Sequence, residues 1–152
     1  MTIQKIHKAR DRRGAKNDSY YTPNPQVELQ SDGRHAILLS DFKIMVSLSK
    51  KRDENERDAR LFIQVPKGFV TDFASIPQLF WSIAPPTGKY ASAAVVHDYL
   101  YATHTTTKAV ADKVFLILMQ RYGVGYIKRK IMYYAVRMFG GSAWNKAREV
   151  IR

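Results

Sequence analysis

The fold is decided by the stretch that runs Ala111-Asp112-Lys113-Val114-Phe115-Leu116-Ile117-Leu118-Met119. Every side chain from Val114 to Met119 is apolar, so a helix made of these residues has no side that suits water. The pattern therefore predicts a buried helix over about 108–122, which Gly123 ends. Such a helix needs other elements packed around it.

Asp112 is the exception on this helix, because its neighbours three, four and seven residues later are all apolar. A carboxylate on an apolar face costs free energy unless a partner pairs with it. The preceding helix, expected over about 90–102, offers His97 and Tyr101, which are four residues apart and share a face. Asp98 points about 100° away from His97. A short helix–helix turn would bring His97 against Asp112.

The hydrophobic period is helical from residue 75 onward. Ser75 and Gln78 form a capping box before a short apolar helix over 78–83. A further helix is expected over about 126–139, and after it Ser142 can cap a last short helix. That last helix presents three apolar residues on one side: Trp144, Ala147 and Ile151.

The helix expected over about 126–139 is amphipathic. Its apolar face is made of Ile127, Ile131, Tyr134, Ala135 and Met138. The run Lys128-Arg129-Lys130 lies off that face. Such a run is usually a solvated surface, but opposite an apolar face it could also dock on anionic lipid.

The N-terminal half shows the period of strands. Strands are expected over about 35–39, 42–48 and 61–65, the second and third with alternating apolar residues, and a charged loop covers 50–60. The fold class is therefore α+β, with a small antiparallel sheet in the N-terminal half, followed by a bundle of about four to five helices.

The domain organisation follows from the same reading. Residues 1–26 form an expected extended basic arm, in which the prolines near its end disfavour helix. Residues 27–152 form a single globular domain, with strands over about 35–65 and helices over about 76–151.

Charge is concentrated at the two ends of the 152-residue chain, which has a net charge of +12. Residues 1–16 hold six lysines and arginines, Arg12 and Arg13 among them, against one aspartate. Residues 121–152 hold eight against one glutamate. Such ends can contact nucleic acid, an anionic membrane surface or acidic patches on proteins. No interleaved aromatic and arginine platform accompanies them, so nucleic acid is the less favoured of these partners.

The composition also bounds the class of protein. Cysteine is absent, which excludes disulfides and thiolate metal sites. No apolar run approaches the roughly 18 residues of a membrane span. The first 16 residues are charged where a signal peptide needs an apolar core. We therefore expect a chain without signal peptide or transmembrane segment, located in the cytoplasm of the cell that makes it.

A histidine oriented by a buried carboxylate is the arrangement that a general base needs, because the carboxylate fixes the tautomer and stabilises the imidazolium. His97 and Asp112 are candidates for these roles. Asp98, on another face, could then hold a hard cation such as calcium, which takes oxygen ligands. The alternative is a structural His–Asp pair that locks two helices, with Asp98 solvated.

Two motifs here resemble those of a known superfamily. The string His97-Asp98-Tyr99-Leu100-Tyr101 is similar to the H-D-x-x-Y helix of the phospholipase A-two superfamily. The string Ala111-Asp112-Lys113-Val114-Phe115 looks like its A-D-x-x-F pattern, which virion lipases of parvoviruses also carry. The resemblance implies that His97 activates water, Asp98 binds calcium, Asp112 orients His97 and Tyr101 braces the network. The glycine-rich calcium loop of that superfamily has no counterpart here, so calcium would need other oxygens.

A longer resemblance covers residues 61–144 and points to a family of uncharacterised phage and prophage proteins. Its motifs are T-D-x-A-S-I-P, H-D-x-x-Y and A-D-x-x-F, which begin here at Thr71, His97 and Ala111. They follow Val65-Pro66-x-Gly68-Phe69 and precede Met132-Tyr133-x-Ala135-Val136-Arg137 and Trp144. The resemblance implies a phage origin and leaves the activity open.

Asp72 is a further candidate, because Ser75 already serves as the helix cap. Asp72 could add a carboxylate to a site with His97 and Asp98, or make a turn to the backbone nearby.

Three hypotheses about the function of the chain follow. The chain is a calcium-dependent hydrolase of lipid or cell-envelope esters, a structural virion component of the tail, neck or baseplate that binds other virion proteins, or a nucleic-acid-binding accessory protein.

Overall fold

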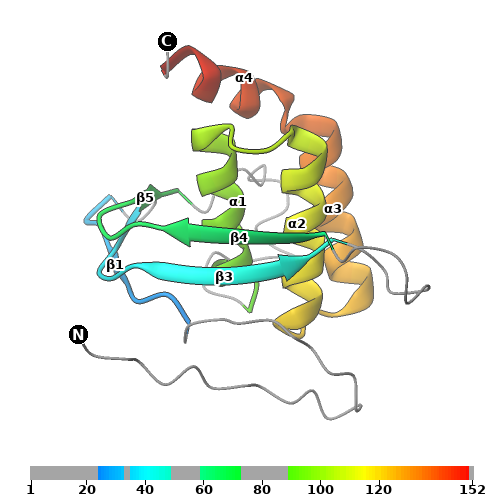
Figure 1. Ribbon diagram of the computed structural model, residues 1–152, viewed down its shortest axis with the longest axis horizontal. Helices are drawn as coiled ribbons and strands as arrows, with labels where there is room; N and C mark the ends of the chain where they lie inside the picture. The colour runs from blue at the N-terminus through cyan, green and yellow to red at the C-terminus, as the bar shows by residue number, and fades with distance from the viewer. Residues whose placement is uncertain (1–23, 33–34, 49–58, 73–88, 151–152) are drawn as a thin grey trace.

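The computed structural model describes residues 24–32, 35–48, 59–72 and 89–150, the last with side chains to Ala147 (Figure 1). Within these residues, five strands come first and four helices follow, so the predicted α+β class is confirmed. The elements in chain order are β1 (Val27–Leu29), β2 (Ala36–Leu38), β3 (Phe42–Ser47), β4 (Arg60–Val65), β5 (Val70–Thr71), α1 (Ala91–Thr103), α2 (Lys108–Arg121), α3 (Tyr126–Phe139) and α4 (Gly141–Val150).

The described strands pair only in the antiparallel sense, in two small sheets. β3 pairs with β4 from Phe42 opposite Val65 to Ser47 opposite Arg60. The other sheet has the order β1-β2-β5. β1 and β5, at three and two residues, are too short to show a period in the sequence.

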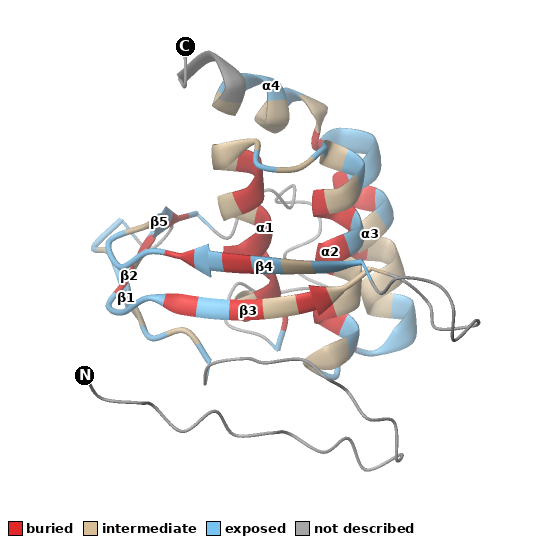
Figure 2. Ribbon diagram, viewed as in Figure 1, coloured by how far each residue is buried: buried red, intermediate tan, exposed pale blue. Residues whose placement is uncertain are grey.

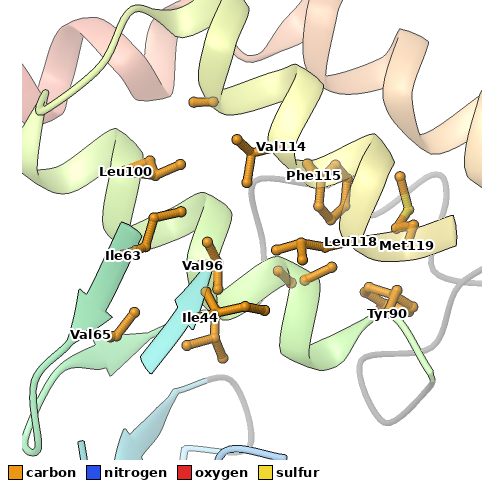
Figure 3. Close-up of a cluster of buried hydrophobic side chains, with 14 of the residues drawn as sticks. Ile44, Ile63, Val65, Tyr90, Val96, Leu100, Val114, Phe115, Leu118 and Met119 are labelled. Carbon is orange, nitrogen blue, oxygen red and sulfur yellow. The ribbon is translucent and has the colours of Figure 1, made fainter. Parts of the chain in front are cut away.

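One face of the β3–β4 pair covers α1 and α2. Side chains that point to this face alternate along the strands and are buried, such as Phe42, Ile44 and Val46 on β3. Figure 3 shows labelled side chains of β3, β4, α1 and α2 gathered in one interior, and in Figure 2 red, buried segments recur along these elements. As predicted, the stretch that begins at Val114 is central to this core. Its most buried members are Val114, Phe115, Leu118 and Met119.

The turn between α1 and α2 sets their relative position. α1 ends at Thr103, and the capping residue His104 adopts the left-handed conformation with φ of 50° and donates its backbone N–H to the carbonyl of Leu100. α2 begins after Thr107, whose hydroxyl accepts the backbone N–H of Val110 at 3.3 Å, as expected of a cap. The turn is short enough to hold the two helices side by side.

α3 packs on α2 through a face other than the apolar face that the sequence suggested. Met132, Ala135 and Val136 are its buried residues, whereas Ile127 and Met138 are 74% and 73% exposed. At 100° per residue, the direction of Met132 and Val136 lies roughly 150° from that of Ile127 and Met138. Both sides of this helix are therefore apolar, and α2 covers only one of them.

Some predicted features lie outside the described residues: the helix over 78–83 with Ser75 and Gln78, and most of the basic arm with Arg12 and Arg13. α4 begins at Gly141, so Ser142 lies within its first turn and does not cap it. Across the part of the chain that the structure describes, no helix has the length and apolar character needed to cross a bilayer.

Candidate functional site

Asp112 of α2 is the centre of a buried polar network. Its Oδ1 accepts the hydroxyl of Tyr101 at 2.7 Å and lies 2.9 Å from Nε2 of His97. Its Oδ2 accepts Nζ of Lys108 at 2.9 Å and lies 3.5 Å from a guanidinium nitrogen of Arg137. The Asp112 side chain has no exposed surface. Three hydrogen-bond donors and one ion-pair partner therefore offset the cost of burying this carboxylate.

Three helices supply these donors. His97 and Tyr101 are one turn apart on α1, so both face α2. Lys108 is the first residue of α2 and reaches Asp112 across one turn, while Arg137 comes from the last turn of α3. Lys108 also donates to the backbone carbonyl of Val136 at 2.9 Å. The network thus joins α1, α2 and the C-terminal end of α3.

Gly140 makes room for the Tyr101 hydroxyl. A Cβ atom at residue 140 would lie 2.6 Å from that hydroxyl oxygen and 2.4 Å from the carbonyl oxygen of Val136. Both distances are too short for carbon–oxygen contact, so only glycine fits here without movement. The residue between α3 and α4 therefore helps to hold Tyr101 against Asp112.

The ionisation of the network follows from its partners. Burial alone would raise the pKa of the Asp112 carboxyl, but the hydrogen bonds from His97, Lys108 and Tyr101 outweigh burial and lower that pKa to about 2. Burial lowers the pKa of the His97 imidazole and Lys108 adds to this, whereas the bond to Asp112 opposes it. At neutral pH, we therefore assign a charged carboxylate beside a neutral imidazole.

This assignment fixes the tautomer of His97. A carboxylate can only accept hydrogen bonds, so Nε2 of the neutral ring carries the proton. Nδ1 then carries the lone pair, and it has no hydrogen-bond partner among the described residues. The ring is held between Tyr101 and Phe115, with centroid distances of 4.1 and 4.8 Å. The arrangement suits a base that accepts a proton at Nδ1.

A cleft of about 330 Å³ lies beside this network. Tyr101 contributes to both, because it lines the cleft while its hydroxyl binds Asp112. His97 itself is 1% exposed and does not line the cleft. The cleft residues come from α1, α4 and the edge around β2 and β5: His35, Phe69, Val70, Asp72, Asp98, Tyr101, Ala102, Ala143 and Ala147.

The structure places the two predicted metal ligands, Asp72 and Asp98, on this same cleft. Asp98 accepts a short hydrogen bond from the Thr71 hydroxyl, which fixes the carboxylate next to β5. No group of three or more histidine, aspartate or glutamate side chains among the described residues is arranged to hold a metal ion. Calcium takes six to eight oxygens, so these two carboxylates do not make a calcium site by themselves.

Three residues of the network and the cleft were not expected from the sequence. Lys108 could have been found, because it is four residues from Asp112 in the same helix. Arg137 and His35 gave no local signal, since their positions depend on how distant elements pack. His35 lines the cleft, and its Nδ1 pairs with Asp32 at a very short distance.

The structure also describes three of the basic surface residues singled out in the sequence. Lys128, Arg129 and Lys130 are half-buried on the first turns of α3, away from the cleft. Lys128 lies over the ring of Tyr90, and the other two lie over the ring of Tyr126. Their charged ends are thus close to aromatic surface.

Comparison with known proteins gives a family match. The profile of the family described as "Protein of unknown function (DUF1353)" matches residues 47–136, more than half of the chain. The uncharacterised protein y4jT of Sinorhizobium fredii (strain NBRC 101917 / NGR234) is 44% identical over 78 residues, which are 50% of this chain and 23% of y4jT. The uncharacterised protein y4iH of the same strain is 30% identical over 116 residues, 75% of this chain and 44% of y4iH. The chain thus spans less than half the length of either relative. No solved structure matches it.

Proposed function

The chain belongs to the DUF1353 family, and we propose that this member is a phage- or prophage-encoded ester hydrolase in which His97 is the general base. The observation that carries the proposal is the neutral His97 ring, which is held by Asp112 through Nε2 and presents the lone pair of Nδ1. The similarity of the motifs to those of phage and prophage proteins supports the origin.

The proposed step is the attack of water on an ester carbonyl. Nδ1 of His97 takes a proton from the water as the water oxygen forms a bond to the carbonyl carbon. The tetrahedral adduct then breaks its bond to the alkoxy oxygen and restores the carbonyl, and the imidazolium gives the proton to the leaving alkoxide. Asp112 stabilises the imidazolium, as its low pKa keeps it charged. Because His97 is buried behind the cleft-lining Tyr101, the step requires Tyr101 to move enough to admit water.

The proposed substrate is an ester of a lipid or another cell-envelope component. The resemblance of the His97-Asp98 and Ala111-Asp112 motifs to the phospholipase A-two superfamily supports this class. Asp98 and Asp72, on the cleft, would then face the substrate. Calcium dependence stays a prediction from the same resemblance, and the proposed proton transfer does not use a metal.

The test is hydrolysis of phospholipid esters by the parent and by His97→Gln, each with and without calcium. Glutamine is close in size but cannot act as a base, so we expect His97→Gln to lose at least about a hundredfold in rate. His104→Asn is the matched control, because His104 is half-buried at the end of α1 and does not line the cleft. Equal rates for the parent and His97→Gln would remove the hydrolase proposal.

One observation favours a second candidate function, a structural component of the virion. The charge of Asp112 already has Lys108 and Arg137 as partners, so the network is complete without a substrate and fixes three helices. In that role the protein binds other virion proteins. Its absence from purified particles of the phage that encodes it would exclude this function, whatever the hydrolysis assay gives.

A further inference from the structure

α3 carries an apolar stripe that the described residues leave uncovered. Ile127, Tyr134 and Met138 are 74%, 56% and 73% exposed. They are spaced by seven and four residues, so they lie along one side of the helix, with the partly buried Ile131 between them. In Figure 2, α3 accordingly shows exposed, pale blue turns. Single exposed apolar residues are ordinary, but an aligned set marks a binding surface.

Basic residues border this apolar stripe. Lys130 lies on one side of it and Lys128 on the other, at 100° per residue. No acidic residue occurs in the sequence from Lys113 to Arg148. Tyr126, at the start of α3, is 64% exposed and lies beside Lys130. Among the described residues of α3, the surface is therefore apolar along its centre and cationic at its borders.

We propose that this face of α3 binds an anionic lipid surface. The hydrocarbon boundary takes up the side chains of Ile127 and Met138, and the lysines reach the lipid phosphates. Tyrosines suit the headgroup level because the ring is apolar and the hydroxyl is polar. A helix with an apolar stripe between basic borders is the pattern of helices that lie in the membrane interface.

Charge and shape favour lipid over the other occupants. A second copy of the chain would bring the cations of two α3 helices together, which costs free energy. A nucleic acid would satisfy the cations but leave Ile127 and Met138 against phosphates and sugars. Of these three occupants, only an anionic lipid surface offers a partner for both the cations and the aliphatic side chains.

This binding does not depend on the proposed hydrolysis. The residues that line the cleft come from other elements, and α3 contributes none of them. The face of α3 is therefore a docking surface for lipid, and the lipid bound there is not the substrate in the cleft. The His97→Gln variant should bind lipid as the parent does, which separates a failure of this inference from a failure of the proposed function.

The experiment is flotation of the full chain with phosphatidylcholine vesicles that contain or lack phosphatidylglycerol, at low and high salt. We expect binding to the anionic vesicles, and weaker binding as salt rises. The double substitution Ile127→Gln with Met138→Gln should lower partitioning by at least about tenfold. Lys130→Gln should lower it by about fivefold. Phe62→Gln, on β4 and 58% exposed in the parent, is the matched control and should bind as the parent does.

Three results would overturn the inference. One is equal partitioning of the double variant and the parent. Another is equal binding to vesicles with and without phosphatidylglycerol. The third is absence of vesicle binding together with a concentration-dependent dimer that the double substitution abolishes, which would assign the stripe to a second copy.

Discussion

The charge of Asp112 can be tested by the substitution Asp112→Asn, which keeps the shape and removes the charge. An asparagine presents one acceptor and one donor group, so its NH2 must face either His97 and Tyr101, which can also accept, or Lys108 and Arg137, which can only donate. The variant leaves the cations without their anion in either orientation, and in one orientation it also turns its NH2 toward them.

The size of the effect follows from the pKa of Asp112. A pKa lowered from an ordinary 3.8 to about 2 means that folding favours the charged form by roughly 2 to 3 kcal/mol. This stabilisation is fully present above pH 3.8 and is lost as pH falls toward 2, because the unfolded chain binds the proton first. We expect Asp112→Asn to lower the free energy of unfolding by about 3 kcal/mol at pH 7.

The assay is urea unfolding of the parent and the variant between pH 7 and pH 2. The difference between them should stay constant down to about pH 5 and then shrink, because only the parent has this carboxylate to protonate. Asp41→Asn is the control. Asp41 is an exposed carboxylate that accepts the backbone N–H of Lys67, so its loss should cost less than about 1 kcal/mol. A difference for Asp112→Asn that does not change with pH would refute the charge assignment.

Three further predictions concern the same network. Gly140→Ala places a methyl group 2.6 Å from the Tyr101 hydroxyl and should lower the free energy of unfolding, measured by thermal unfolding, by about 1 to 3 kcal/mol. Gly141→Ala, in open space, should cost nothing, and equal stabilities of the two variants would contradict the packing argument. Tyr101→Phe should lower the free energy of unfolding by about 1 kcal/mol, measured in urea, because Asp112 loses one of its donors; no loss would show that this hydrogen bond is not formed in solution. The rate of hydrolysis should rise with pH and reach its plateau below the ordinary histidine pKa of 6.5, because burial lowers the pKa of His97. An inflection of the pH–rate profile above 6.5 would argue against a neutral His97 ring.

The sequence predicted the fold class because the change of period is long-range and regular. Val114 to Met119 identify a buried helix whatever packs on it, and the alternation in β3 identifies a strand with one covered face. The two shortest strands, β1 and β5, hold too few residues to show any period. Both pair with β2, and no local pattern reveals that pairing.

The sequence likewise predicted some residues of the candidate site and not others. That Asp112 needs a partner followed from its apolar neighbours, and the spacing of His97 and Tyr101 put both on one face. Arg137 could not be foreseen, because it reaches Asp112 only through the way in which α3 packs on α2. The exposed side of α3 was hidden for a similar reason: both sides of the helix are apolar, and periodicity cannot say which one the domain covers.

The shared carboxylate also constrains how the sequence can change over time. Replacing Asp112 by an apolar residue would leave Lys108 and Arg137 without their common anion, whereas replacing either cation alone would leave the other to hold it. Asp112 is therefore the last member of the network that can be lost, after the cations have been replaced. We expect related chains to keep an acidic residue at this place wherever they keep a basic residue at the start of α2.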